Sequence, residues 1–100
     1  MAKKLPSVHP GEILREEFLR PMALTPYALA AAIKVPRTRI ERLVREETPV
    51  TADTALRFGK YFGMSAVFWM NMQTQFDLET TEDTLVGEIR KIEPRAVEPA

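Results

Sequence analysis

The chain has 100 residues, of which 45% are hydrophobic and 28% charged, and its formal net charge is zero. This length fits a single domain, and the composition is that of an ordinary folded protein with one modest core. The absence of cysteine and the presence of one histidine, His9, exclude disulfide scaffolds, zinc fingers and metal sites that need two imidazoles. No apolar run approaches the roughly eighteen residues of a membrane span. The sequence therefore predicts a soluble cytoplasmic protein without metal or other cofactor.

Charge is distributed unevenly along the chain. Residues 1–76 carry 11 Lys and Arg against 7 Asp and Glu, whereas residues 77–100 carry 3 against 7, so the two parts have net charges of +4 and −4. Basic residues are densest between Lys34 and Arg45, where Glu41 is the one acidic residue. A basic stripe followed by an acidic tail indicates one anionic partner and is compatible with a second, basic partner.

The pattern of apolar residues predicts an all-α fold, because no sustained period-two alternation and no hairpin dipeptide occur. Five short helices are expected in chain order. They cover about 11–20, 26–33, a segment from Pro36 to about Arg45, a segment between Thr51 and Gly63, and a segment that follows Ser65 and carries the aromatic residues up to Phe76.

Proline, glycine and hydroxyl residues set the expected helix ends. Pro21 should close the first helix, and Thr25 should cap the second, with Pro26 at its first position. Gly63 is the expected C-terminal stop of the fourth helix. Gly59 inside that helix lowers its stability, so we expect a neighbouring backbone to approach there.

The C-terminal segment has a pattern of its own. Thr80 and Asp83 have the spacing of a capping box, which predicts a sixth, acidic and amphipathic helix that ends before Pro94. An exposed apolar stripe on a small protein is unfavourable unless another surface buries it. We therefore predict that the apolar stripe of this helix forms a dimer interface, while its acidic face could attract a basic protein. The stripe consists of Leu85, Val86, Ile89 and Ile92. The expected division is an N-terminal arm (1–10), a main helical domain (11–78) and a C-terminal helix and tail (79–100).

Residues 26–45 have the pattern of a helix-turn-helix, in which two short helices are joined by a turn and the second helix is basic. Ala30 is small where the helices would cross, and Ile40 and Leu43 would anchor the second helix. The opposite, solvent-facing side would carry Arg37, Thr38, Glu41, Arg42 and Arg45. Arginine can bind guanine O6 and N7 in a major groove. The alternative is a solvated helix on which Glu41 and Arg45 form a surface ion pair.

Catalytic chemistry finds little support. His9 and Glu12 form an H-x-x-E motif, and Glu12 and Glu16 are one helical turn apart, but further convergent ligands are missing. No hydroxyl has a histidine partner in a suitable context for nucleophilic catalysis. We therefore expect a binding protein and not an enzyme.

Several strings together resemble the HigA-type antitoxins, which include virulence-associated protein I and belong to the phage-repressor-like helix-turn-helix proteins. The resemblance covers about residues 8–78. The matching strings are HPGEILREEF at 9–18, YALA at 27–30, VPR at 35–37, TADTALR at 51–57, YFG at 61–63, and Phe68-Trp69 with Asn71 and Gln73. Two residues depart from the family pattern: Pro26 replaces a polar residue that can reach DNA, and Lys34 replaces the glycine of the turn.

The resemblance implies a compact five-helix DNA-binding core, a homodimer, repression of its own operon at an inverted-repeat operator of double-stranded DNA, and neutralisation of a small basic mRNA-cleaving toxin. With the pattern of residues 26–45, it gives a set of expected DNA contacts. They are Thr25, Tyr27, Pro36, Arg37, Thr38, Arg39, Glu41, Arg42 and Arg45. Two alternatives remain: a stand-alone regulator without a toxin, and a protein-binding module whose helix-turn-helix no longer reads DNA.

Overall fold

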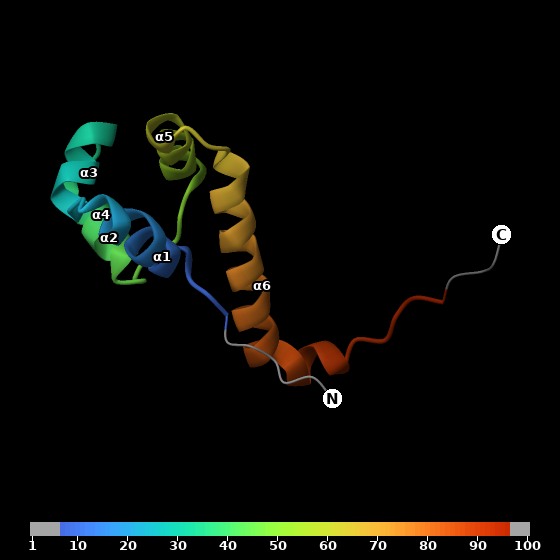
Figure 1. Ribbon diagram of the computed structural model, residues 1–100. Coiled ribbons are helices and arrows are strands. Elements are labelled where there is room, and N and C mark those ends of the chain that lie inside the picture. Colours follow the sequence, from blue (N-terminus) through green and yellow to red (C-terminus); the bar gives the residue numbers. More distant parts are fainter. Residues whose placement is uncertain (1–6, 97–100) are drawn as a thin grey trace.

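The computed structural model describes residues 7–96, and within this range the regular structure is entirely helical (Figure 1). The elements are α1 (Pro10–Ile13), the π-helical segment η1 (Leu14–Leu19), α2 (Arg20–Met22), α3 (Pro26–Ile33), α4 (Arg37–Val44), α5 (Ala52–Phe62) and α6 (Ala66–Arg90). Because α1, η1 and α2 are continuous, residues 10–22 form one rod, and the described chain has five helices. The predicted all-α, five-helix fold is confirmed. No helix of residues 7–96 combines the length and apolarity of a membrane span.

The first rod starts earlier and ends later than predicted. His9 caps it, because the Nδ1 atom of His9 accepts a hydrogen bond from the Gly11 N–H at 2.9 Å. The expectation that Pro21 closes this helix is wrong, since helical turns continue to Met22 and the chain turns at Ala23, which is left-handed (φ 49°). The preceding π-helical turns are wider than α-helical turns, which gives the proline ring space beside the earlier carbonyls.

The starts of α3, α5 and α6 and the end of α5 lie at the residues expected from the sequence. The hydroxyl of Thr25 accepts a hydrogen bond from the Ala28 N–H at 3.0 Å, and Thr51 and Ser65 act in the same way at the starts of α5 and α6. Gly63 ends α5 in the left-handed conformation (φ 67°), as expected. These local signals fix where the chain turns between its helices.

The core lies where the first rod, α3, α4, α5 and the first half of α6 meet. Trp69 is fully buried, with ring centroids 4.8 Å from Phe58 and 5.1 Å from Phe18. A Cβ atom on Gly59 would lie 2.8 Å from the Met64 carbonyl oxygen, so the predicted close approach of a neighbouring backbone is confirmed. This packing holds α5 and α6 together as a hairpin.

The last two predicted helices form a single helix, α6, of 25 residues. The N-terminal cap expected at Thr80 is wrong: its hydroxyl donates to the Phe76 carbonyl at 2.9 Å, within the helix. Such threonine bonds to the preceding turn often bend helices. Figure 1 shows the C-terminal end of α6 turning away from the globular body, and the molecule measures 55 × 31 × 24 Å.

Candidate nucleic-acid interface

Helices α3 and α4 form the predicted helix-turn-helix. Leu29 and Ala30 on α3 and Ile40 and Leu43 on α4 are buried, with exposed fractions of 1% or less, so the two helices share one apolar contact. The turn begins at Lys34, which is left-handed (φ 63°) although it has a side chain. This conformation explains why glycine is the more usual residue there, because a Cβ atom is strained in the left-handed region.

The opposite side of α4 is open to solvent. Arg37, Thr38 and Arg42 are exposed on it, Glu41 is half-buried, and Arg45 follows the helix as its exposed C-cap. Arg39 is also exposed, at the edge of this face towards α5. Within residues 7–96, the guanidinium of Arg42 has no ion-pair or hydrogen-bond partner. A free, forked donor at the middle of an exposed helix face can reach a base edge.

The remaining charges on this face pair differently from the sequence-based alternative. Glu41 lies 3.4 Å from Arg37, one turn before it, and Arg45 lies 3.0 Å from Glu47. The surface pair of Glu41 and Arg45 considered from the sequence is therefore wrong. Both pairs are at least partly exposed, so each contributes little to stability, and the arginines can exchange these partners for another anion.

Residues at the N-termini of α3 and α4 border the same face. Tyr27 is 64% exposed, and the guanidinium carbon of Arg37 lies 5.9 Å from the centroid of its ring. The hydroxyl oxygen of Thr25 accepts the capping bond, and its O–H remains able to donate. Pro36 is the N-cap of α4 and supplies no side-chain acceptor to the first turn. Helix N-termini favour anions, so the N-termini of α3 and α4 are suited to bind phosphate groups.

Between α4 and the start of α5 lies a hollow of about 400 Å³ lined by Thr38, Arg42, Thr48 and Thr51, among others. Thr48 and Asp53, which line this hollow, and Arg57 were not among the contact residues predicted from the sequence. Arg39 points to this side, where its Nη1 atom lies 2.7 Å from the carboxylate of Asp53. The only sequence signal for that contact was the opposite charge, which does not by itself indicate a partner fourteen residues away.

His9 has a structural role in this fold. Its side chain is 5% exposed, and its ring contacts the ring of Phe76 edge-on, with centroids 4.8 Å apart. Burial lowers the pKa of His9, although the nearby carboxylates of Glu46 and Asp77 and a hydrogen bond to the Thr48 backbone oppose the effect. No group of three metal-ligating side chains occurs within residues 7–96.

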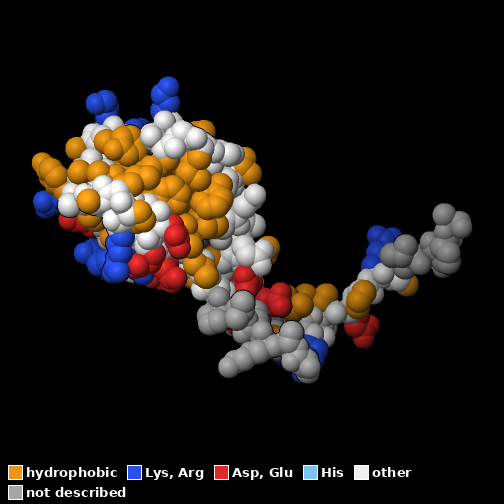
Figure 2. Space-filling model, in the orientation of Figure 1, with side chains coloured by type: hydrophobic (Ala, Val, Ile, Leu, Met, Phe, Trp, Pro, Cys, Tyr) orange, Lys and Arg blue, Asp and Glu red, His pale blue; other side chains and the backbone are white. Residues whose placement is uncertain are grey.

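The predicted dimerisation residues lie apart from α4, at the C-terminal end of the chain. Leu85, Val86 and Ile89 on α6 and Ile92 beyond it have exposed fractions between 40% and 65%. Figure 2 shows hydrophobic side chains in this region, outside the globular body. The stripe therefore exists on the surface, and nothing within residues 7–96 covers it.

The fold and the exposed arginine face define the class of a helix-turn-helix protein. No family model matches the chain. It is 54% identical over 79 residues to virulence-associated protein I of Dichelobacter nodosus, which covers 79% of this chain and 73% of the relative. It is 34% identical over 84 residues to antitoxin HigA-1 of Vibrio cholerae, covering 84% and 79% of the two chains.

Solved structures agree with these relatives. The Pseudomonas aeruginosa antitoxin HigA with the higBA promoter superposes with a TM-score of 0.87 at 44% identity, covering 90% of this chain and 99% of that one. Antitoxin GraA in complex with its operator gives a TM-score of 0.87 at 39% identity over 98% and 99%. The chain belongs to the HigA family of helix-turn-helix antitoxins and transcription regulators, which are not enzymes.

Proposed function

We propose that this protein binds operator DNA near its own promoter through the exposed face of α4. The observation that carries the proposal is the unpaired, exposed guanidinium of Arg42 on a helix that Ile40 and Leu43 anchor in the core. The solved HigA and GraA structures, which hold a promoter and an operator, support it. The proposed contact residues are those expected from the sequence: Thr25, Tyr27, Pro36, Arg37, Thr38, Arg39, Glu41, Arg42 and Arg45.

Two groups of these residues differ in position. Arg37, Thr38 and Arg42 on the outer face of α4 are placed to enter a major groove, where arginine can form two hydrogen bonds with guanine. Tyr27 and Pro36, at the helix starts, are placed for the phosphate backbone, where contacts orient the protein but carry no sequence information. Arg45, at the end of α4, adds positive charge to the same face.

We further propose that the protein acts as a dimer with an inverted-repeat operator. Two copies of α4 related by a two-fold axis can enter successive major grooves about 34 Å apart. The exposed stripe of Leu85, Val86, Ile89 and Ile92 is the proposed seam, because burying it removes apolar surface from water. In this proposal residues 11–78 form the DNA-binding domain and residues 79–100 the association segment. Of residues 1–10, which the sequence assigned to an arm, His9 and Pro10 are buried and belong to the domain.

Neutralisation of a small mRNA-cleaving toxin completes the proposed function. It is supported by membership of an antitoxin family and by the net charge of −4 over residues 77–100, which complements a basic partner. In this proposal direct contact keeps the toxin inactive. The alternative is a solitary regulator, and the adjacent open reading frame distinguishes the two: a small basic protein that co-purifies with this chain supports the antitoxin role.

Fluorescence anisotropy tests the DNA proposal. Purified protein is titrated against duplex DNA from immediately upstream of its own gene and against a scrambled duplex, at several salt concentrations. We expect tighter binding to the upstream duplex, with a log–log salt slope of about 0.9 per phosphate contact. Equal, weak binding to both duplexes at every salt concentration would exclude an operator reader and favour a protein-binding module.

A further inference from the structure

The carboxylate of Asp53 connects α5 to the recognition helix α4. Asp53 is the second residue of α5, and its Oδ1 atom accepts a hydrogen bond from Arg39 Nη1 of α4 at 2.7 Å. The same oxygen accepts a second bond from Arg57 Nε, one turn further along α5, at 2.8 Å. Asp53 therefore holds two guanidinium groups, one from the recognition helix and one from its own helix.

Arg57 extends this connection to the turn of the helix-turn-helix. Its Nη1 atom donates to the Ile33 carbonyl at 2.8 Å and lies 3.4 Å from the Lys34 carbonyl. These carbonyls flank the left-handed turn, whose conformation is unfavourable for lysine. A continuous set of hydrogen bonds thus runs from the α3–α4 turn through Arg57 and Asp53 to Arg39.

We infer that Asp53 and Arg57 are positioning residues, which fix the α3–α4 turn and the first turns of α4 against α5. Arg39 then holds the recognition helix in place through its contact with Asp53 and does not contact a base. This inference rests on the proposed function only for its effect on DNA binding. Of the nine proposed contact residues, Arg39 would therefore not contact DNA bases. Base contacts would come from Arg37, Thr38 and Arg42 on the outer face of α4.

The energetics favour a positioning role over a stabilising one. The side chains of Arg39, Asp53 and Arg57 are between 40% and 54% exposed, and exposed ion pairs add little to the free energy of unfolding. Hydrogen bonds from Arg57 and, to a lesser extent, Arg39 hold the pKa of Asp53 below its ordinary value. The carboxylate therefore stays ionised at neutral pH, and both guanidinium groups keep a fixed acceptor.

Amide hydrogen exchange tests the inference without DNA. The variants are Asp53→Asn and Arg57→Lys, which keep size or charge but lose the shared geometry, and the control is Lys60→Gln, an exposed cation on the same helix. The amides of Val35 and Arg39, which bond to Ala30 and Pro36, report on the turn and on α4. We expect them to exchange roughly tenfold faster in both variants, with core amides and the control unchanged. Unchanged exchange at Val35 and Arg39 overturns the inference.

Operator affinity supplies the second readout, at a temperature where every variant is folded. We expect Arg39→Gln and Asp53→Asn each to weaken operator binding about five- to tenfold. The double variant should bind operator as tightly as the single variant with the lower affinity, because both substitutions remove the same Arg39–Asp53 contact. The salt slope should not change. A slope lower by about 0.9 in Arg39→Gln, with wild-type affinity in Asp53→Asn, shows that Arg39 contacts DNA itself and overturns the inference.

The two proposals can fail separately. If the wild-type protein does not distinguish operator from scrambled DNA, the proposed function is wrong, and the exchange rates at Val35 and Arg39 alone decide the inference. If the wild type binds operator and those rates are unaffected by Asp53→Asn and Arg57→Lys, the proposed function stands and the positioning role is wrong.

Discussion

The backbone of Gly11 packs directly against the carbonyl of Leu43, at the C-terminal end of the recognition helix. A Cβ atom on residue 11 would overlap the Leu43 oxygen and would lie 3.1 Å from the His9 ring nitrogen. Because both neighbours belong to buried, hydrogen-bonded structure, neither can move aside easily. The first rod and α4 are therefore in register only with glycine at this position.

Gly11→Ala should lower the free energy of unfolding by about 1–3 kcal/mol, the usual cost of overpacking. Urea denaturation followed by circular dichroism measures the change. The matched control is Gly87→Ala on α6, where an added Cβ atom meets nothing within 4 Å. This control should raise helix stability by up to about 1 kcal/mol, since alanine is the better helix former. Equal stability of Gly11→Ala and wild type would contradict the close contact.

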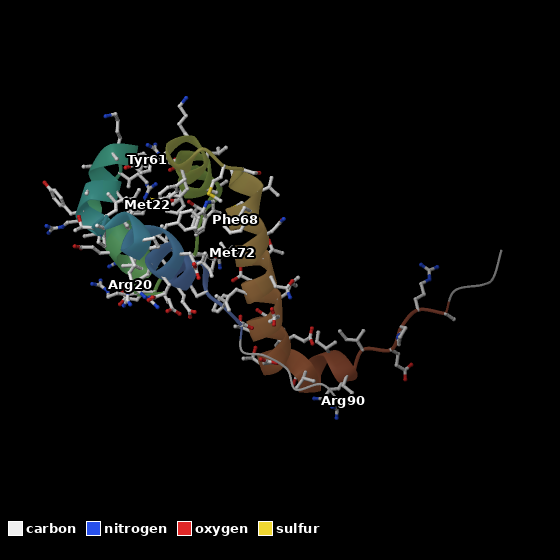
Figure 3. The ribbon with its side chains drawn as sticks, in the orientation of Figure 1. Arg20, Met22, Tyr61, Phe68, Met72 and Arg90 are labelled. Carbon is white, nitrogen blue, oxygen red and sulfur yellow. The ribbon has the colours of Figure 1, made fainter. Side chains whose placement is uncertain are left out.

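Arg42→Ala should weaken operator binding by about 1–3 kcal/mol if the guanidinium reads a base, which is roughly 5- to 150-fold in affinity. Binding to scrambled DNA should fall much less. Arg90→Ala is the control, because Figure 3 places Arg90 at the far end of α6, away from α3 and α4. Fluorescence anisotropy with both duplexes measures the four affinities. If Arg42→Ala binds operator as tightly as wild type, the reading face is assigned wrongly.

Lys34→Gly should stabilise the protein by about 1 kcal/mol, because glycine adopts the left-handed conformation of the turn without a Cβ penalty. The midpoint of urea denaturation should rise accordingly. Lys60→Gly, in the last turn of α5, removes the same side chain from a right-handed helical position and should lower the free energy of unfolding by up to about 1 kcal/mol. Opposite signs for the two lysines are expected, and destabilisation by both would argue against strain at Lys34.

Acidification should destabilise the protein through His9. Its pKa in the folded state is lowered, mainly by burial, below the ordinary value of 6.5. The unfolded chain therefore takes up a proton first as the pH falls, so the contribution of His9 is complete above about pH 6.5 and declines through the lower, folded-state pKa. Protonation of Nδ1 also removes the acceptor for the Gly11 N–H.

Urea denaturation at several pH values between 7.5 and 5 measures this effect. His9→Asn serves as the comparison, because asparagine can still cap the helix but does not titrate. The difference in stability between wild type and His9→Asn should shrink as the pH falls. A difference that stays constant over this range would show that His9 does not contribute to the pH dependence.

Ile89→Glu should dissociate the proposed dimer, because it places a charge in the exposed stripe that the second copy would cover. Gly87→Glu adds the same charge two residues away, on nearly the opposite side of the helix. Sedimentation velocity over a range of concentrations measures both. A dimer in Gly87→Glu and a monomer in Ile89→Glu is the expected result. Dimers of equal stability in both would place the seam elsewhere.

Local signals in the sequence determined most of the helix boundaries and the helix-turn-helix. Thr25, Thr51 and Ser65 cap helices with bonds to neighbouring N–H groups, and Gly63 ends α5, because these interactions involve residues only two to four positions apart. The apolar spacing on α4 likewise indicated which side is buried. The resemblance of the short strings to HigA proteins then agreed with relatives and solved structures over most of the chain.

Two predictions of helix ends failed on local interactions: the hydroxyl of Thr80 donates to the Phe76 carbonyl inside α6, and π-helical turns precede Pro21. The tertiary structure decided the features that depend on distant residues. Arg39 pairs with Asp53, fourteen residues away, and Arg57 reaches the turn at Ile33. A sequence pattern records which side chains can pair, but only the packing of α5 against the helix-turn-helix brings these particular charges within hydrogen-bonding distance.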